Sequence, residues 1–542
     1  MKLHVNQLGY YPQGIKQAVL EKTEDLSLPV VLKNKDGQIL MSFDSPSFTQ
    51  DEASQTVSAI LDFSSLDQCG KYFFALPDGT EIPVEIKYDP ADKLFIDAQK
   101  MFYFQRCGTE LESRYAGIYA HKACHTAKVR YLNEDRETEC CGGWHDAGDY
   151  GRYVTAGAVA VGHLLYAFEL APEAFGTALN IPESGNGIPD ILNEVKYELD
   201  WFLKMQEADG SVHHKCTSMH HTDFLMPEND PLPFIITPIS SLATADFAAA
   251  AAMGARIYKK YDAGYAAKLA DAAKRAGEWL LDNPEFLFKN PDNVYTGDYR
   301  DVSDTDERFW AAAELARLDG DKRFLDIAVK GIENREFSLT GLGWEEVGGL
   351  GTLCILSDNA AFFGRDIYEK AKEIWLGAAG YFKDITMSNP YSTAMKPEEF
   401  QWGSNLEVLS KAIILNYAGR LSGKKEFINA SVRQLDYILG ANPLDQSYVT
   451  GYGTKPLMNP HNRPTVADNI TDPIPGFVSG GPNRNRADQE VKEQIPEGTA
   501  PMKCFIDDWK SYSTNEITIY WNSPLVLLLA LLFGEFDDPA RA

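Results

Sequence analysis

The hydrophobic pattern of this chain changes near residue 90, and this change limits the folds that the chain can adopt. Before it, short runs rich in β-branched and aromatic residues are separated by turn signals, which is typical of β-strands. Seven such runs at this spacing predict a small β-sandwich of the immunoglobulin type. The runs cover residues 4–8, 17–21, 28–32, 38–43, 56–63, 70–76 and 81–86.

After residue 93 the apolar residues recur at helical spacing, as in a set of six that shares one side of a helix: Ile191, Leu192, Val195, Leu199, Phe202 and Leu203. About twelve helical stretches are expected between residues 92 and 535, and the longest loop runs from about 440 to 510. The polar segment 87–93, KYDPADK, is typical of a linker. We therefore predict a mainly α chain with two domains, a β-sandwich over residues 1–88 and a helical domain over residues 93–542.

Charge limits the partners of such a chain. Its 51 Lys and Arg residues against 78 Asp and Glu residues give a formal net charge of −27, which repels phosphate backbones and anionic lipid head groups. Nucleic-acid and membrane-surface roles are therefore disfavoured. The longest apolar run, residues 525–533, is about half of what spans a bilayer.

The first residues, MKLHVNQLGYYPQG, contain no apolar run of the kind that a secretory signal needs, so a cytoplasmic location is expected. In a reducing compartment the 8 cysteines should be thiols or metal ligands rather than disulfides.

Two stretches hold carboxylates in settings suited to acid–base chemistry. In GGWHDAGDYGRYV, residues 142–154, Asp146 and Asp149 are three apart among glycines, where two close carboxylates favour one water or cation between them. A helix cap followed by a loop turn explains the same residues. In the stretch 504–526, Glu516 lies among aromatic and aliphatic residues, and burial there would raise its pKa toward that of a general acid. A capping role in the last helix is the alternative.

Another group of residues has the donor types of a metal site. Cys107, Cys124, His125 and His145 would supply two thiolates and two imidazoles, a set that suits four-coordinate zinc. Their spacing is not that of a standard zinc finger.

Three segments, taken together, resemble glycoside hydrolase family 9. They are DAGD at 146–149, SYVTGYGTKPLMNPHNR at 447–463 and FIDDWKSYSTNEITIYWNS at 505–523, and the resemblance covers nearly the whole chain. It implies a catalytic (α/α)6 barrel of twelve helices, preceded by the immunoglobulin-like module of one branch of the family. It also implies an inverting hydrolase.

The resemblance assigns a role to each candidate residue. Asp149 would be the general base, Asp146 would hold the attacking water and Glu516 would be the general acid, with the acid and base carboxyl groups roughly 6.5 to 9.5 Å apart. His461 would act beside them, and Asp507 would be either a catalytic helper or a structural acceptor.

Further residues would bind the sugar or the metal. Arg463 and Tyr512 belong to the family signatures, and the resemblance implies a structural zinc at the four Cys and His residues. Sugar rings stack on exposed aromatic faces, which we expect from Trp310, Trp344, Trp402 and Tyr452. Four histidines in a segment that resembles a cleft loop are expected to be a polar lining: His213, His214, His220 and His221.

The predicted function is hydrolysis of β-1,4 bonds in glucan or glucosamine-containing oligosaccharides. An exo-acting, intracellular enzyme is favoured because a cytoplasmic protein meets only imported oligosaccharides, and an acidic cleft would suit a cationic amino sugar. An endoglucanase is the alternative. A non-catalytic sugar-binding protein should have lost one of the three carboxylates, and a phosphorylase would need a phosphate pocket.

Overall fold

The N-terminal part is a sandwich of two four-stranded sheets. A computed structural model describes residues 2–23, 28–358 and 361–536, and within them the sheets have the orders β1-β2-β6-β5 and β4-β3-β7-β8. Leu20, Leu32, Leu61 and Phe74 are fully buried between the sheets. The predicted β-sandwich is therefore confirmed. Its strands are β1 (Lys2–His4), β2 (Gln17–Glu21), β3 (Val30–Asn34), β4 (Ile39–Phe43), β5 (Thr49–Asp51), β6 (Thr56–Asp62), β7 (Gly70–Ala75) and β8 (Glu81–Ile86).

The first predicted strand, residues 4–8, is displaced. β1 ends at His4, and the next residues turn toward the helical part, where the backbone N–H of Gln7 donates to Leu439 O at 3.0 Å. These residues pair with a loop of the helical part rather than with the sheet. β5, which the sequence pattern did not indicate, is a three-residue edge strand.

The rest of the described chain is mostly helical. Its long helices are α1 (Asp92–Phe104), α3 (Val154–Leu170), α4 (Asp190–Met205), α5 (Ser241–Tyr258), α6 (Ala263–Asp282), α7 (Thr305–Asp319), α8 (Lys322–Asn334), α9 (Gly348–Ser357), α10 (Arg365–Ser388), α11 (Ser404–Ser422), α12 (Lys425–Ile438) and α16 (Ile519–Leu532). Shorter helices lie in the loops: α2 (Ser113–Ala116), α13 (Arg463–Ala467), α14 (Gln489–Gln494) and α15 (Tyr512–Asn515).

The long helices form an inner and an outer set. The inner set, buried on nearly all sides, is α3, α5, α7, α9, α11 and α16. The outer set is α1, α4, α6, α8 and α10, which keep a partly exposed polar face, and α12, whose outer side contacts the sandwich. Helices that are apolar all round belong in a core, and amphipathic helices cover it. The inner helices contact one another in the order α11, α16, α3, α5, α7 and α9. Six inner and six outer helices among the described residues agree with the predicted (α/α)6 barrel.

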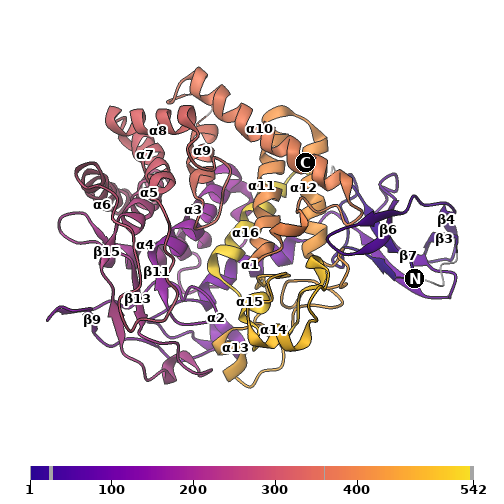
Figure 1. Ribbon diagram of the computed structural model, residues 1–542, viewed down its shortest axis with the longest axis horizontal. Helices are drawn as coiled ribbons and strands as arrows, with labels where there is room; N and C mark the ends of the chain where they lie inside the picture. The colour runs from indigo at the N-terminus through magenta and orange to yellow at the C-terminus, as the bar shows by residue number, and fades with distance from the viewer. Residues whose placement is uncertain (1, 24–27, 359–360, 537–542) are drawn as a thin grey trace.

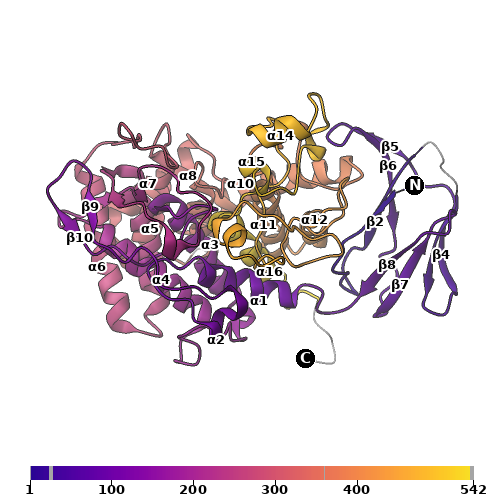
Figure 2. The same ribbon diagram turned by 90° about the horizontal axis from the view of Figure 1, so that it is seen from below.

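The sandwich lies at one end of the long axis of the molecule, beside α10 and α12 (Figures 1 and 2). Asn6 Nδ2 donates to Asp436 Oδ1 at 2.8 Å, and Arg433 Nη1 holds Asp436 Oδ2 at 2.6 Å and Gln17 O at 3.1 Å. The last strand ends at Ile86 and α1 begins at Asp92, so we propose the domain boundary between them, as the linker composition predicted.

Short strands between the helices were missed by the sequence pattern. A five-stranded sheet has the order β10-β9-β14-β13-β11, and β12 pairs with β15. Their bounds are β9 (Val129–Tyr131), β10 (Glu137–Thr138), β11 (Arg152–Tyr153), β12 (Val212–His213), β13 (Lys215–Ser218), β14 (Phe234–Ile236) and β15 (Ile239–Ser240). Runs of two to four residues are too short for an alternating pattern to stand out.

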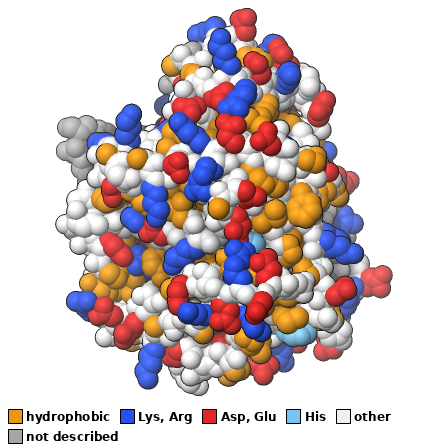
Figure 3. Space-filling view, turned by 90° about the vertical axis from the view of Figure 1, so that its left-hand side faces the viewer, with side chains coloured by type: hydrophobic (Ala, Val, Ile, Leu, Met, Phe, Trp, Pro, Cys, Tyr) orange, Lys and Arg blue, Asp and Glu red, His pale blue; other side chains and the backbone are white. Residues whose placement is uncertain are grey.

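One face of the molecule has acidic and basic side chains interspersed, with no single acidic patch across it (Figure 3). Among the described residues, no helix combines the length and the apolar composition needed to cross a membrane.

Candidate active site

The base motif, DAGD at residues 146–149, forms a loop that packs against the His-x-Arg segment, residues 461–463. The N–H of Asp146 donates to Gly151 O at 2.9 Å, which closes the loop before β11, and Arg463 N donates to Gly148 O at 3.0 Å. A Cβ atom on Gly148 would lie 2.0 Å from the carbonyl oxygen of His461. Only glycine therefore allows these two segments to approach so closely.

Asp146 lies in the core with one oxygen held and one free of protein contacts. Tyr299 Oη donates to its Oδ2 at 2.5 Å, whereas its Oδ1 has no hydrogen-bond partner among the described residues. Burial raises the pKa of Asp146 well above its usual value, the nearby charge of Asp149 adds to this, and the hydrogen bond from Tyr299 opposes it.

Asp149 has the opposite electrostatic setting. Burial would raise its pKa, but His221 Nδ1 lies 3.4 Å from Asp149 Oδ2, the Gly151 N–H donates to the same oxygen at 3.0 Å, and Arg463 adds positive charge. Together they hold the pKa of Asp149 below its usual value. This carboxylate therefore stays ionised in mildly acidic solution.

Glu516 lies between α15 and α16, and its backbone is held from both sides. The Gly480 N–H donates to Glu516 O at 2.9 Å, and the Thr518 side chain caps α16 by accepting from Trp521 N at 3.0 Å. Burial raises the pKa of Glu516 well above its usual value, and the charges of Asp149 and Asp146 raise it further. Two carboxylates with opposite pKa shifts thus share one site, as acid–base catalysis requires.

His461 and Arg463 lie beside the loop that carries Asp146 and Asp149. His461 Nδ1 lies 2.6 Å from Trp509 O, so Nδ1 carries the proton and Nε2 is an acceptor. Burial lowers the pKa of His461 to about 4, which keeps the ring neutral. Arg463 Nη1 donates to Gly148 O at 2.9 Å, and its Nε to Thr222 O at 3.0 Å.

Asp507 has the contacts of a structural acceptor. Its two oxygens accept from the N–H groups of Met458 and Asn459, both at 2.8 Å, and Asn515 Nδ2 donates to it at 3.2 Å. These bonds fix the segment that leads to His461. They favour the structural role over the catalytic one, the two alternatives that the sequence left open.

Two of the predicted stacking aromatics, Trp402 and Trp344, lie near this site, as does the signature residue Tyr512. Tyr512 and Trp402 are 38% and 50% exposed and form a tilted pair 5.2 Å apart, and the Tyr512 ring lies 6.1 Å from His461. Trp344 is partly buried and packs edge-on against Tyr299 at 5.0 Å. Each ring is therefore placed beside a residue that contacts the carboxylates or the His-x-Arg segment.

The same prediction is wrong for Trp310 and Tyr452. Trp310 is fully buried on α7 and packs against Gly162, so it has no face for a sugar. Tyr452 is 8% exposed, its hydroxyl donates to Asp97 Oδ2 at 2.5 Å, and Lys93 lies over its ring.

The predicted histidine lining also needs correction. His213 and His214 are buried, and His214 stacks on Phe288 at 3.8 Å, because the β12 and β13 segment turns them inward. His220 and His221 belong to the following loop, and only His221 contacts a candidate carboxylate.

The four predicted metal ligands lie close together in the structure. The donor atoms of Cys107, Cys124, His125 and His145 all lie within 4.8 Å of one another. His145 Nε2 and His125 Nδ1 are 3.4 Å apart, and the two thiol–imidazole contacts measure 3.8 and 4.0 Å. Tetrahedral zinc with ordinary bond lengths places its donors roughly 3.3 to 3.8 Å apart. The donor set and its geometry therefore fit a four-coordinate metal.

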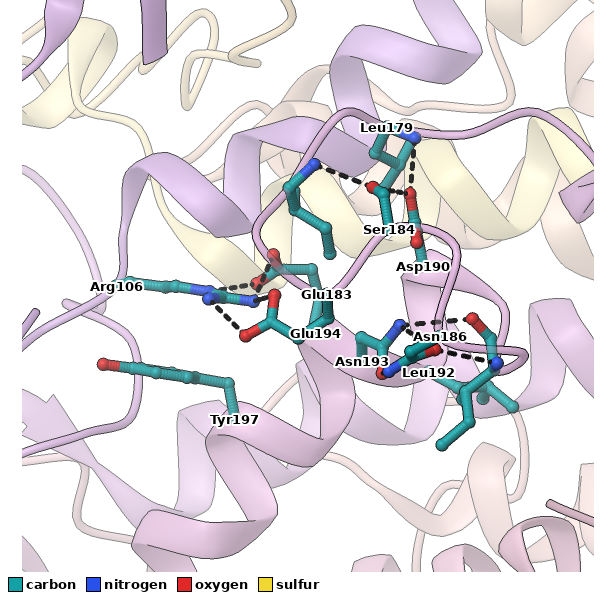
Figure 4. A network of polar contacts seen from close by, with 12 residues as sticks. Arg106, Leu179, Glu183, Ser184, Asn186, Asp190, Leu192, Asn193, Glu194 and Tyr197 are labelled. Carbon is teal, nitrogen blue, oxygen red and sulfur yellow. Dashed lines mark hydrogen bonds and ion pairs between the residues drawn. The ribbon is translucent and has the colours of Figure 1, made fainter. Parts of the chain in front are cut away.

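The Cys107 end of this cluster is anchored to α4 (Figure 4). Arg106 donates two hydrogen bonds to Glu194, at 2.8 and 3.0 Å, and two to Glu183, at 2.9 and 3.1 Å. Tyr197 Oη donates to Cys107 O at 2.6 Å. Bidentate pairs of this kind fix both distance and angle, so α4 and the loop before it hold the segment after α1 that carries Cys107.

Tyr299 was missed by sequence reasoning. It follows a loop without a motif, and its backbone has φ of 44°, which is uncommon for an aromatic residue. Tyr299 and Asp146 are 153 residues apart in the chain, so no local sequence pattern indicates that they are in contact.

Comparison with known proteins identifies the family and agrees with the fold. The model of "Glycosyl hydrolase family 9" matches residues 92–529, and that of "Cellulase N-terminal ig-like domain" matches residues 1–81. The chain belongs to glycosyl hydrolase family 9. It is a glycoside hydrolase. The match at residues 1–81 agrees with the predicted N-terminal immunoglobulin-like module.

This family 9 hydrolase is similar to characterised relatives over its whole length. It is 42% identical to a cellodextrinase of Butyrivibrio fibrisolvens, covering 98% of this chain and 99% of the relative. It is 35% identical to endoglucanase D of Acetivibrio thermocellus, covering 100% and 86%. Among solved structures, a thermostable endoglucanase mutant from Alicyclobacillus acidocaldarius has a TM-score of 0.91 at 34% identity, covering 98% and 99%.

Proposed function

We propose that the protein hydrolyses β-1,4 bonds of short cello-oligosaccharides, with inversion, from a chain end. The observation that carries acid–base hydrolysis is the presence in one site of two carboxyl groups with opposite pKa shifts, lowered at Asp149 and raised at Glu516. Similarity to a cellodextrinase over nearly all of both chains supports the substrate class. The presence of all three carboxylates argues against a sugar-binding protein without activity.

In the proposed reaction, Glu516 donates its proton to the glycosidic oxygen while Asp149 removes a proton from water. The water oxygen attacks the anomeric carbon from the face opposite the leaving group, so the glycosidic bond breaks as the new C–O bond forms. Asp146 Oδ1, which has no partner among the described residues, accepts a hydrogen bond from this water. Tyr299 fixes the other oxygen and so the orientation of the carboxyl group.

The neighbouring groups bind the sugar. Neutral His461 offers Nε2 as an acceptor to a sugar hydroxyl. Arg463 donates hydrogen bonds to two backbone carbonyls, and these bonds orient its guanidinium group beside the base. Trp402 and Tyr512 offer apolar faces for a pyranose ring.

We propose that Cys107, Cys124, His125 and His145 hold a structural Zn²⁺. Bound there, the metal would have all four positions filled by the protein and would stabilise the fold rather than activate water. A solved zinc-binding triple mutant of endoglucanase J30 is similar, with a TM-score of 0.90 and 31% identity over 97% of this chain and 99% of that one, and it supports the compatibility of zinc binding with this fold.

Product analysis tests the function. Purified protein incubated with cellotetraose should release one product size from one chain end, and proton NMR should show the α-anomer first. Random scission of carboxymethyl-cellulose would contradict the exo mode and favour the endoglucanase alternative, which the endoglucanase relatives keep open. First-formed β-anomer would contradict inversion.

Sugar identity is tested in the same assay. Glucosamine oligomers are the alternative substrate. Faster cleavage of glucosamine oligomers than of cellotetraose would reverse the assignment. Intracellular action on imported sugars stays a prediction, which cell fractionation would check.

A further inference from the structure

A loop between β13 and β14 contacts Asp149, Tyr150 and Arg463 in the candidate site. We call residues 219–232 the cleft loop. Its His221 lies 3.4 Å from Asp149, its Thr222 carbonyl accepts from Arg463 Nε at 3.0 Å, and its Leu225 carbonyl accepts from Tyr150 Oη at 2.5 Å. The placement of His221 beside the base therefore depends on how this loop is held.

The far end of the cleft loop reaches the metal cluster. Asp230 Oδ2 lies 3.2 Å from His125 Nε2, and the two side chains are 1% and 5% exposed. Asp230 Oδ1 accepts from Leu232 N at 3.0 Å, so the carboxylate is also tied to its own loop. A buried carboxylate against an imidazole is stable only when both are fully hydrogen-bonded.

The geometry of His125 gives this contact a direction. Its Nδ1 points into the cluster, 3.4 Å from His145 Nε2 and 3.8 Å from Cys107 Sγ. An imidazole that binds a metal through Nδ1 keeps its proton on Nε2, which then donates to Asp230. A metal-bound histidine that donates its second N–H to a carboxylate is a recurrent arrangement, and it fixes the ring and raises metal affinity.

We propose that Asp230 is a positioning residue that couples the Cys and His metal centre to the cleft loop and so holds His221 against the base. The proposal rests on the zinc site proposed above. It makes the metal centre act on the loop of residues 146–149 from two sides, through His145, which precedes Asp146, and through His125, Asp230 and the cleft loop.

The test uses the full chain with Asp230→Asn, which keeps the size of the side chain and removes its charge. Zinc affinity is measured by competition with a chromogenic chelator, and amide exchange in peptides covering 219–232 is measured by mass spectrometry. We expect zinc binding about 10- to 100-fold weaker and exchange in the cleft loop about 10-fold faster. Asp223→Asn, an exposed carboxylate in the same loop, is the matched control and should change neither quantity.

Metal removal and the Asp230→Asn substitution together form a cycle of the kind used for double mutants. Stripping zinc from the unsubstituted protein should loosen the cleft loop, and stripping it from the Asp230→Asn variant should add little, since the link is already cut. Independent, additive effects would overturn the proposal, as would zinc affinity within twofold of the unsubstituted protein. Unsubstituted protein that holds no zinc would overturn this proposal and the zinc site together. None of these readouts uses hydrolysis, so they do not depend on the proposed reaction.

Discussion

Asp149 and Glu516 carry the same chemical group, and their surroundings give them opposite protonation states. His221, Arg463 and a backbone N–H favour the charged form of Asp149, whereas burial and two neighbouring carboxylates disfavour the charged form of Glu516. The base needs to be ionised and the acid protonated, so the site is active between the two pKa values.

Replacing Glu516 by Gln removes the proton that the leaving oxygen needs. We expect kcat on cellotetraose to fall by about 10²- to 10⁴-fold, with the fold intact by circular dichroism. Glu497→Gln, at an exposed position, is the control. Near-normal turnover by the Glu516 variant would exclude it as the general acid.

The pH profile should report His221. Because this side chain holds the pKa of Asp149 down, activity is lost only when pH falls below the usual range of a carboxylate. His221→Ala raises the pKa of Asp149, so the acid limb of kcat/KM should move to higher pH while the alkaline limb, set by Glu516, stays. His220→Ala should leave both limbs in place, and an unmoved acid limb in the His221 variant would contradict this account.

Tyr299→Phe tests the orientation of Asp146. Loss of the 2.5 Å hydrogen bond frees one carboxylate oxygen and raises the pKa of Asp146 further. A hydrogen bond to a charged group is worth about 1.5 to 3 kcal/mol, so kcat should fall about 10- to 100-fold with KM little changed. A change in KM alone would show that Tyr299 contacts substrate instead.

At the scale of elements, the sequence predicted the sandwich and twelve long helices because burial leaves a periodic record in each. The four Cys and His residues that the sequence grouped together do lie together, since thiols and imidazoles are few and chemically distinctive. Tyr299, Asp230 and the strands β9–β15 were not, because their roles come from contacts between segments far apart in the chain. The prediction of sugar stacking was wrong at Trp310 for a related reason, because the sequence alone does not distinguish a tryptophan buried on an inner helix from one that lines a cleft.

The proposed metal would join three segments of the chain through Cys107, Cys124 with His125, and His145. Removal of zinc by a strong chelator should lower the melting temperature, since a ligand that binds only the folded state stabilises it by mass action. Cys124→Ser should reproduce most of the decrease, whereas Cys69→Ser, at an exposed position outside the cluster, should not. Equal melting temperatures with and without chelator would rule out a structural metal.

At the scale of the whole molecule, the N-terminal sandwich holds the loop that leads to His461. Gln7 Oε1 accepts from Thr454 N at 2.8 Å and from Lys455 N at 2.9 Å, and its Nε2 donates to Asp445 O at 2.8 Å. Gly440 and Gly453 leave room for this side chain, because a Cβ atom on either would lie within 2.5 Å of it.

Gln7→Ala should therefore act at a distance. We expect a loss of about 1 to 3 kcal/mol in unfolding free energy, measured by denaturant titration, together with weaker substrate binding as the 439–457 segment loosens. Gln68→Ala, exposed on the same sandwich, is the control. A fall in stability with an unchanged KM would confine the role of Gln7 to docking.

The order of these contacts along the chain also sets the order in which the enzyme is completed on the ribosome. The metal ligands and both base-side carboxylates lie between residues 107 and 149, so that half of the site can assemble while most of the barrel is still unmade. Gln7 finds its loop only after residue 455 emerges, and Glu516 follows roughly 20 to 70 seconds behind Asp146 at ordinary rates of synthesis. A nascent chain thus holds the base long before the acid, and becomes a hydrolase only at its last helix.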